Sequence, residues 1–215
     1  MRPGLLVDVS RCFGCFACVV GCKNWHGLPA GGPDRIRIVD IALGVYPHVS
    51  RWILPVPCMQ CEHPACVAVC RFSACVRDED GIVRVDADRC TGCELCTLAC
   101  PYGARTIRPD TGKADGCDLC RDRLAEGKPP LCVEACPGEA LIFGDLDDPE
   151  SLIRRRIEET GAEALLRRYQ TRPRVFYGGL GRLREPSSQG MELLEEAVTG
   201  RSRHERPTQG RGGRS

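Results

Sequence analysis

Large aromatic side chains are scarce in this sequence of 215 residues, where phenylalanine, tryptophan and tyrosine together make up 5%. Hydrophobic residues of all kinds reach 42%. Because large apolar side chains supply much of the area that a core buries, so few of them leave a conventional core thin. The length allows one domain or two small ones, and some other bond must help to hold them together.

A charge excess of either sign is missing as well. The chain has 30 basic and 29 acidic residues, for a net charge of +1, so its overall charge gives no reason to expect nucleic acid binding. Residues 199–215 are a local exception, with five arginines and one glutamate among glycine, serine and proline. We expect a disordered, solvated tail there rather than a binding arm.

Long apolar runs are also absent. No stretch approaches the roughly 18 consecutive apolar residues of a membrane helix, and residues 1–8 do not have the form of a secretory leader. We therefore expect no direct membrane span. The expected location is cytoplasmic or membrane-associated through partners, and periplasmic only if a partner subunit carries the chain there.

Catalytic signatures are the last absence. The sequence holds no nucleophile–base pair, phosphate-binding loop or flavin motif. We therefore expect that the chain by itself is not an enzyme.

Cysteine, in contrast, is abundant, with 17 residues. Disulfides, zinc and iron–sulfur clusters are the three chemical explanations for such a density. All but Cys75 fall into four groups of four. The groups are Cys12, Cys15, Cys18 and Cys22; Cys58, Cys61, Cys66 and Cys70; Cys90, Cys93, Cys96 and Cys100; and Cys117, Cys120, Cys132 and Cys136.

The first and third groups have the spacing C-x2-C-x2-C-x3-C, which is typical of bacterial ferredoxins, and Pro101 follows the third. Three thiolates within seven residues can bind three corners of one iron–sulfur cube. The fourth, three residues further on, points away and completes a cube bound by a partner group. Two groups thus hold two clusters, and four groups predict four [4Fe–4S] clusters.

Zinc and disulfides fit this pattern less well. Zinc sites use two well-separated C-x2-C pairs, which only the fourth group resembles. Disulfides within C-x2-C pairs are strained, and the number of cysteines is odd. Metal analysis would separate a zinc-bound interaction module from an iron–sulfur protein.

The local patterns predict several elements. Residues 5–9 and 140–143 are expected to be strands, Asp80-Gly81 a hairpin turn, residues 119–126 a short helix, and residues 172–177 extended chain. Asp148 and Pro149 predict a helix start, and residues 162–169 a second helical run. After the last cysteine of groups two, three and four, an alanine (Ala74, Ala104 or Ala140) lies four residues on, where a small side chain lets the backbone approach a cluster.

The sequence resembles the four-cluster iron–sulfur subunits of the molybdopterin oxidoreductases related to dimethyl sulfoxide reductase, including polysulfide, thiosulfate, tetrathionate and arsenate reductases. The likeness covers about residues 5–180. The motifs that carry it are CFGCFAC with CKN from Cys12, VPCMQCEHPAC from Val56, DGIV from Asp80, CPYGAR from Cys100, CDLC from Cys117, GDLDDP from Gly144 and RPRVFY from Arg172.

This resemblance implies how the cysteines share clusters, since groups one and four pair in that family, as do groups two and three. The implied sets are Cys12, Cys15, Cys18 and Cys136; Cys117, Cys120, Cys132 and Cys22; Cys58, Cys61, Cys66 and Cys100; and Cys90, Cys93, Cys96 and Cys70.

The implied fold is α+β: two bacterial-ferredoxin-type units, each with two [4Fe–4S] clusters, one inserted within the other, followed by a C-terminal helical extension and a disordered tail. Residues 1–48 and 111–147 would form the outer unit and residues 49–110 the inserted one. Residues 148–180 would be a helical extension with a docking segment, and residues 181–215 a mostly disordered tail. Strands at 52–56 and 105–107 are expected to close the sheet of the inserted unit.

The implied function is non-catalytic electron transfer within an oxidoreductase complex. The partners would be a molybdopterin or tungstopterin catalytic subunit and a membrane anchor subunit that reacts with quinone. The alternative is a polyferredoxin subunit for a hydrogenase, carbon monoxide dehydrogenase or tungsten aldehyde oxidoreductase. Identification of the co-purifying large subunit would separate the two.

Residues beside the cysteines carry further expectations. Arg71 stands where the family usually has proline, and Cys75 has no counterpart, so we interpret it as a small buried residue beside a cluster. Lys23, Arg71 and Arg105 are either cations that raise a cluster's reduction potential or surface charges. Trp25, His26 and His63 are interpreted as packing or hydrogen-bonding residues, since cysteine fills every ligand position.

Overall fold

The computed structural model describes residues 1–184 and 189–200. At its centre is a three-stranded sheet in the order β8-β1-β9, formed by β1 (Pro3–Asp8), β8 (Leu141–Asp145) and β9 (Val175–Gly178). Strand β1 runs antiparallel to β8 and parallel to β9. The strands predicted near both ends of the cysteine-bearing region are therefore confirmed, and the extended chain at 172–177 does pack back onto them.

Both faces of this sheet are covered, which is why all six residues of β1 are buried. Helix α6 (Leu152–Thr160) lies over one face, where Leu6, Ile142 and Ile153 pack together. Leu5 and Val7 point to the other face and join the main core. Because side chains alternate along a strand, β1 contributes to both.

Two expectations about the segment after β8 were wrong. Helix α6 is capped by Ser151 rather than Asp148. The Asp148 carboxylate accepts a hydrogen bond from the Glu150 backbone N–H, which closes a turn ahead of the helix. The second helical run at 162–169 is only a 3₁₀ turn, η2 (Arg167–Tyr169). Leu166 before it has a φ of 52° and interrupts helical geometry.

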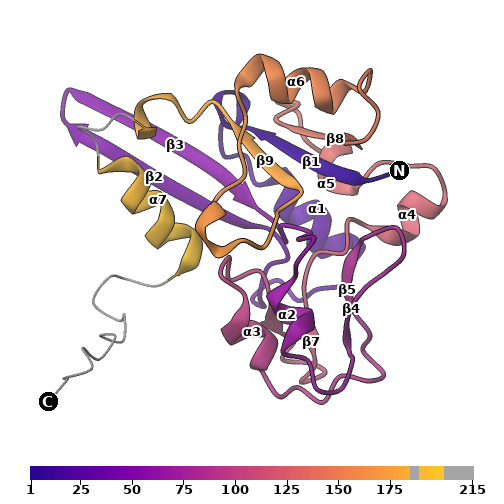
Figure 1. The fold of residues 1–215 in the computed structure, drawn as a ribbon. Helices are drawn as coiled ribbons and strands as arrows, with labels where there is room; N and C mark the ends of the chain where they lie inside the picture. The colour runs from indigo at the N-terminus through magenta and orange to yellow at the C-terminus, as the bar shows by residue number, and fades with distance from the viewer. Residues whose placement is uncertain (185–188, 201–215) are drawn as a thin grey trace, which may run out of the picture.

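The longest strands form a separate hairpin, β2 (Arg37–Val45) and β3 (His48–Val56), which extends to the left in Figure 1. The expectation that the strand at 52–56 closes a sheet with 105–107 was therefore wrong. Residues 52–56 pair with β2, and β6 (Thr106–Ile107) pairs with β7 (Ala114–Asp115) instead. Both strands find partners nearby in the sequence, which close with less loss of chain entropy.

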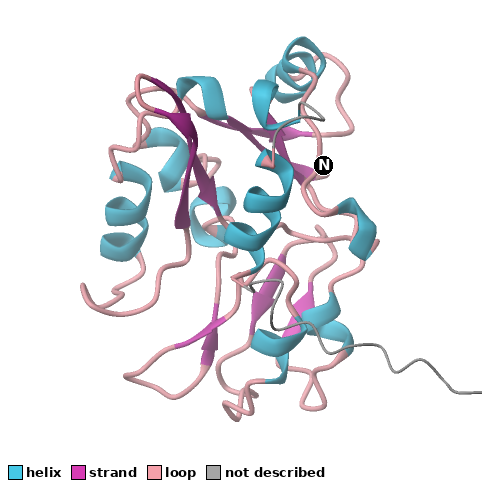
Figure 2. Ribbon diagram, turned by 90° about the vertical axis from the view of Figure 1, so that its left-hand side faces the viewer, coloured by secondary structure: helices cyan, strands magenta, loops and turns pink. Residues whose placement is uncertain are grey.

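The cysteine-bearing region consists of short elements joined by long loops (Figure 2). Its helices are α1 (Ala17–Trp25), α2 (Ala65–Ala68), α3 (Leu95–Ala99), α4 (Arg121–Ala125) and α5 (Leu131–Glu134). Strands β4 (Cys75–Arg77) and β5 (Val83–Val85) form the hairpin predicted at Asp80-Gly81, and Gly81 has the left-handed φ of 80° that a tight turn favours. The short helix predicted at 119–126 is present as α4.

Part of the C-terminal segment is helical, which corrects the expectation of a mostly disordered tail at 181–215. After η3 (Gly181–Arg184), helix α7 (Gly190–Thr199) buries Leu194 and Val198. The guanidinium of Arg37 on β2 donates to the Val198 carbonyl at 2.7 Å, which satisfies a carbonyl at the end of the helix. Residues 185–188 and 201–215 of the predicted tail lie outside the described residues.

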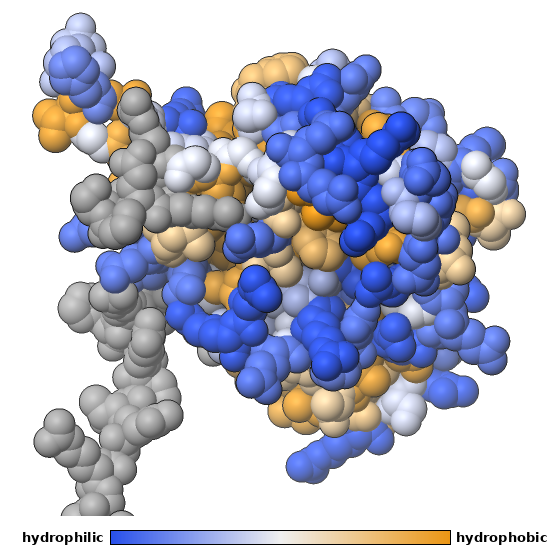
Figure 3. All heavy atoms as spheres, turned by 45° about the horizontal axis from the view of Figure 1, so that its top comes forward, coloured by the Kyte–Doolittle hydropathy of each residue, from blue (hydrophilic) through white to orange (hydrophobic). Residues whose placement is uncertain are grey.

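Hydrophilic side chains cover most of the face around α6, with smaller apolar areas between them (Figure 3). Within residues 1–184 and 189–200, no helix has both the length and the apolar character needed to cross a membrane.

Candidate functional site

The four C-x2-C segments share one backbone conformation. In each, the residue before the second cysteine has a left-handed φ: 73° at Gly14, 47° at Gln60, 71° at Gly92 and 56° at Leu119. Such values are unfavourable for residues other than glycine, so Gln60 and Leu119 are held there by their surroundings, and both side chains are buried. The repeat seen in the spacing of the cysteines is therefore also a repeat of structure.

The third cysteine of each group also has a fixed place. Cys18, Cys66, Cys96 and Cys132 are each the second residue of a short helix, in α1, α2, α3 and α5 respectively. The first turn of a helix exposes unpaired backbone N–H groups. Sulfur atoms at these positions therefore lie beside donors that favour negative charge.

The three alanines identified in the sequence each form a backbone hydrogen bond to the last cysteine of their group. The N–H groups of Ala74, Ala104 and Ala140 donate to the sulfur atoms of Cys70, Cys100 and Cys136 at 3.3, 3.4 and 3.3 Å. Such hydrogen bonds stabilise a thiolate over a thiol. The expectation that a small residue brings the backbone close to these sulfurs is met at all three positions.

The first of three cysteine-lined cavities contains Cys58, Cys61, Cys66 and Cys100. Three of these belong to group two and one to group three. About 320 Å³ within it, counted to its mouth, is free of protein atoms. Arg105, Tyr102 and Thr171 complete its wall.

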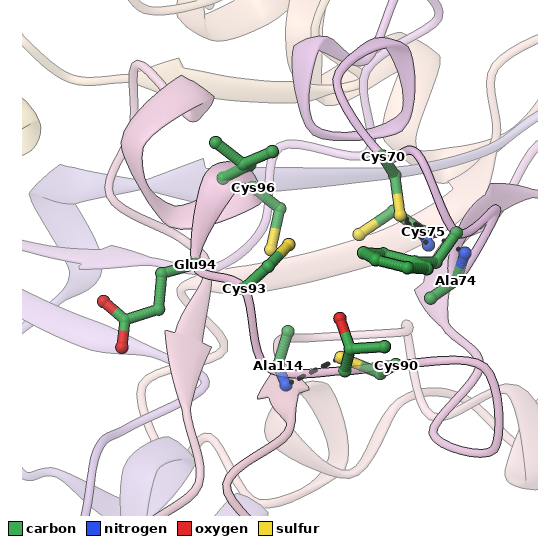
Figure 4. A pocket seen from close by; sticks show the side chains of 11 residues that line it. Cys70, Ala74, Cys75, Cys90, Cys93, Glu94, Cys96 and Ala114 are labelled. Carbon is green, nitrogen blue, oxygen red and sulfur yellow. Dashed lines mark hydrogen bonds between the residues drawn. The ribbon is translucent and has the colours of Figure 1, made fainter.

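The second cavity contains Cys70, Cys90, Cys93 and Cys96, with Cys75 as a fifth cysteine (Figure 4). Three of the four come from group three and one from group two. The Cys70 sulfur accepts backbone hydrogen bonds from Ala74 and Cys75, and the Cys90 sulfur accepts one from the Ala114 N–H at 3.2 Å. The carboxylate of Glu94 points away from the sulfur atoms in Figure 4.

Cys75 is buried, with 3% of its side chain exposed, and its backbone N–H donates to the Cys70 sulfur at 3.3 Å. A hydrogen bond from its thiol lowers the pKa of Cys96 to about 6. The same bond raises the pKa of Cys75. Cys75 is therefore a buried residue beside the four other cysteines of this cavity, as interpreted from the sequence.

The third cavity contains Cys12, Cys15, Cys18 and Cys136, three cysteines from group one and one from group four. About 350 Å³ within it, counted to its mouth, is free of protein atoms. Burial, and then the nearby charges of Cys12 and Cys136, raise the pKa of Cys18 to about 11. Without a positively charged group, such a site keeps its thiols protonated.

The remaining cysteines, Cys22, Cys117, Cys120 and Cys132, are all buried. Burial, followed by the charges of Cys120 and Cys22, raises the pKa of Cys132 well above its ordinary value. Burial, followed by the charge of Cys132, likewise raises the pKa of Cys117. These four therefore also lie close together, again as three residues of one group and one of another.

The donor set and its arrangement suit an iron–sulfur cluster. In each cavity, the thiols and mainly apolar walls surround the free space, and the thiols do not converge on one point. Within the described part of the chain, no three His, Cys, Asp or Glu side chains come close enough to hold a single metal ion. Thiolate cages around a polynuclear group are the usual iron–sulfur environment.

The three cations identified beside cysteines differ in their surroundings. Arg105 is buried in the wall of the first cavity. Lys23 forms an ion pair with Asp34 at 2.8 Å and donates to three carbonyls of the loop after α1, so it holds that loop. Arg71 is exposed. Of the three, only Arg105 faces the cysteines.

Trp25 and His26 form contacts of the kind expected. The Trp25 indole donates to Asp122 at 2.9 Å, and the guanidinium of Arg123 lies over its ring. The His26 ring nitrogen lies 3.6 Å from the Cys120 sulfur. His63 is exposed and uses its backbone N–H to bind the Thr171 carbonyl.

Sequence reasoning missed Thr171 and the side chain of Gln60. The Thr171 hydroxyl is hydrogen-bonded to Tyr102 at 2.7 Å and also lowers the pKa of Cys61, which burial raises to about 12. Gln60 donates to the Cys117 carbonyl at 2.8 Å and accepts from the Val83 N–H at 2.7 Å. Thr171 lies far from any cysteine in the sequence, so no motif could have indicated it.

Comparison with known families agrees with this chemistry. Residues 49–146 match a family described as a 4Fe-4S dicluster domain, and residues 9–25 match a 4Fe-4S binding domain. Together with the four groups of cysteines, these matches indicate four [4Fe–4S] clusters.

Relatives that match over most of their length belong to reductases. The thiosulfate reductase electron transfer subunit PhsB of Salmonella typhi is 42% identical over 176 residues, which cover 76% of this chain and 91% of that protein. A tetrathionate reductase subunit of Salmonella typhimurium is 40% identical over 182 residues, which cover 83% of this chain and 73% of that protein. A selenate reductase subunit of Mesobacillus selenatarsenatis is 34% identical over 206 residues, which cover 80% of this chain and 70% of that protein.

Two findings agree: the sequence identity extends over most of both chains, and the structure is an α+β fold with ferredoxin-type cysteine loops and cavities lined by thiols. The chain therefore belongs to the family of electron-transferring iron–sulfur subunits of the molybdopterin oxidoreductases.

Proposed function

We propose that the chain relays electrons through four [4Fe–4S] clusters between a molybdopterin catalytic subunit and a second redox partner, and that it transforms no substrate itself. The observation that carries this is the mixed origin of each cysteine-lined cavity, three residues from one group and one from its partner. That arrangement is the one expected of paired ferredoxin loops. When bound, each cluster accepts and releases one electron.

The proposed ligands follow from the cavities and from the fourth set of neighbouring cysteines. Cluster 1 takes Cys12, Cys15, Cys18 and Cys136; cluster 2 takes Cys22, Cys117, Cys120 and Cys132; cluster 3 takes Cys58, Cys61, Cys66 and Cys100; cluster 4 takes Cys70, Cys90, Cys93 and Cys96. On this assignment, residues 49–110 supply every ligand of clusters 3 and 4 and form a unit inserted into the outer one.

The cysteines of clusters 1 to 4 are called sets 1 to 4, and charge effects between these sets support a linear order. The charge of Cys18, in set 1, is among those that raise the pKa of the buried Cys132, in set 2. The charge of Cys58, in set 3, is among those that raise the pKa of the buried Cys117, also in set 2. Residues 61–75 then lead from set 3 to set 4. Electrons would therefore pass in the order 1, 2, 3, 4 or its reverse.

The two ends of this order reach the surface. Cys15 of set 1 and Cys93 of set 4 are exposed. Phe13 and Phe16 line the mouth of the set 1 cavity and are themselves exposed, as are Phe72 and Leu95 at the set 4 cavity. Exposed apolar side chains around a cofactor suit protein contacts, so we propose one end for the catalytic subunit and the other for a membrane anchor subunit.

Iron content tests the proposed cofactors. Four cubes require about sixteen irons and sixteen acid-labile sulfides per chain. Anaerobically purified protein should be brown and should bleach on reduction. Stoichiometric zinc with little iron would contradict the proposal, and co-purification with a hydrogenase subunit instead of a pterin enzyme would redirect the assignment of partners.

Cys75 gives a sharper test of the proposed ligands. Cys75 lies beside the four proposed ligands of this cavity without being one of them. Cys75→Ala should therefore retain about sixteen irons per folded chain. Cys70→Ala, five residues earlier in the same cavity, should lose or degrade one cluster. Ligand supply is coupled to folding, so iron is compared per mole of folded protein. Equal iron loss in both variants would make Cys75 a ligand.

A further inference from the structure

Arg105 is a buried charge without an oxygen partner. Its side chain is 3% exposed. None of its three guanidinium nitrogens has a hydrogen-bond partner within residues 1–184 and 189–200. Burying a guanidinium costs several kcal/mol unless an opposite charge compensates it. Its position therefore requires either a negative group or acceptors for its N–H groups.

The other buried arginines show what compensation looks like here. Arg123 donates to the Pro129 carbonyl at 2.9 Å and to the Glu134 carboxylate. Arg174 donates to the Gln60 carbonyl at 2.9 Å and to that of Gly81. Arg105 faces sulfur instead. Burial lowers the pKa of Arg105, but the negative charges of Cys58 and Cys66, followed by that of Cys75, raise it by more.

These neighbours belong to two different cavities. Cys58 and Cys66 line the set 3 cavity, whose wall includes Arg105 itself. Cys75 and Cys96 line the set 4 cavity. Cys66 of the set 3 cavity packs with Cys75 and Cys96 in one cluster of buried residues. The guanidinium therefore lies between the two sets.

The backbone makes room for this position. A Cβ atom on Gly116 would lie 2.7 Å from Arg105 Nη1 and 2.8 Å from the Ala104 carbonyl oxygen. Both distances are well inside van der Waals contact, so a side chain at residue 116 would displace the guanidinium or the backbone before it. The close approach of the glycine backbone keeps Arg105 directed toward the thiols.

We propose that Arg105 is a cation shared by clusters 3 and 4, which raises the reduction potentials of both and so makes this pair the electron-accepting part of the relay. The inference rests on the proposed function. Reduction adds one negative charge to a site, and a fixed positive charge in a water-poor surrounding stabilises that product. Arg105 compensates whichever of its two neighbours is reduced.

Redox titration of the whole protein, followed by electron paramagnetic resonance, tests this. In Arg105→Gln and in Arg105→Met, two of the four clusters should shift to lower potential. We expect at least a tenfold fall in their ratio of reduced to oxidised protein at a fixed potential, which corresponds to about 59 mV for a one-electron couple. The other two clusters should not move.

Two matched variants separate charge from shape. Arg105→Lys keeps the charge, so it should retain most of the reduction potential that the neutral variants lose. Arg71→Gln removes an exposed arginine that adjoins the proposed ligand Cys70. Because solvent screens its charge, the ratio of reduced to oxidised protein at a fixed potential should stay within a factor of about two for all four clusters.

The remaining outcomes are decisive in either direction. A shift in one cluster only, in all four, or in none, with full iron content, would overturn the proposal. If both neutral variants lose clusters while Arg105→Lys keeps them, a positive charge is required and the proposal stands; loss in Arg105→Lys as well would show that shape alone matters. Iron missing from the unaltered protein would instead contradict the proposed function.

Discussion

Replacing Cys100 with alanine should destroy a cluster whose other three ligands lie outside its own cysteine group. Cys100 is the last residue of group three in sequence, yet it lines the cavity of Cys58, Cys61 and Cys66. Without a fourth thiolate, that site should lose up to four of about sixteen irons per chain. The set 4 cavity keeps all four of its cysteines and should stay intact.

Thiol labelling identifies which cluster is lost. Under native anaerobic conditions, a small alkylating reagent reacts with thiols that no longer bind iron, and mass spectrometry of the peptides locates them. In Cys100→Ala the labels should fall on Cys58, Cys61 and Cys66. In the reciprocal variant Cys70→Ala they should fall on Cys90, Cys93 and Cys96. Labels on Cys90, Cys93 and Cys96 in Cys100→Ala would refute the shared ligation.

The same variant should interrupt electron transfer. In a linear order, set 3 lies between sets 2 and 4, so its loss removes an internal step. Electron transfer from end to end should fall by more than tenfold, the lower bound expected when support of a metal site is lost. Cys75→Ala is the matched control, because it also removes a buried thiol beside a cluster. An unchanged rate in Cys100→Ala would exclude the linear order.

The cysteine loops could be anticipated from the sequence because their information is local. Groups one and three place three thiols within seven residues, and the alanine four residues after the last cysteine of groups two, three and four indicated where the backbone approaches sulfur. These features repeat in the chain, so each occurrence supported the others. The strands β1 and β8 were recognisable for a similar reason, as short apolar runs beside the first and last cysteines.

What could not be anticipated depends on contacts between distant residues. The strand at 52–56 has the pattern of a strand, but nothing in it specifies pairing with β2 instead of residues 105–107. The segment from Leu165 to Thr171 has helical spacing, yet its backbone turns to place Leu165 and Leu166 in the core and Thr171 beside Cys61. Tertiary packing overrides local propensity at such positions.

Arg174 is the clearest of these long-range contacts. It is 1% exposed and lies on the C-terminal side of the chain, beside β9. Its guanidinium donates to the Gln60 carbonyl at 2.9 Å and to the Gly81 carbonyl, while its backbone N–H donates to the Met59 carbonyl at 2.9 Å. One side chain thus joins the strand to the C-x2-C loop of group two and to the β4–β5 hairpin.

The contact continues into the outer part of the fold. Gln60, held by Arg174, binds the Cys117 carbonyl through its own side chain. The segment of residues 49–110 therefore depends on polar partners at residues 117 and 174, as well as on the β2 strand before it. The proposed inserted unit therefore takes part of its supporting contacts from the outer part of the fold.

Arg174→Met should accordingly be strongly destabilising. The substitution keeps an apolar chain of similar length but leaves two buried carbonyls without donors, and each hydrogen bond from a charged group contributes roughly 1.5–3 kcal/mol. A loss of about 3 kcal/mol or more would lower the melting temperature by roughly 6–12 °C in a chain of this size. The measurement is the temperature at which cluster absorbance bleaches, taken anaerobically at one scan rate.

Arg155→Met is the matched control, since Arg155 is an exposed arginine on α6 and its loss should change stability by no more than about 0.5 kcal/mol. Arg174→Lys keeps the charge but cannot donate to both carbonyls in the same geometry, so it should lie between the unaltered protein and Arg174→Met. A melting temperature for Arg174→Met equal to that of Arg155→Met would mean that water or a local rearrangement satisfies both carbonyls. In that case the Arg174 side chain would not be what links the C-terminal strand to the cysteine loops.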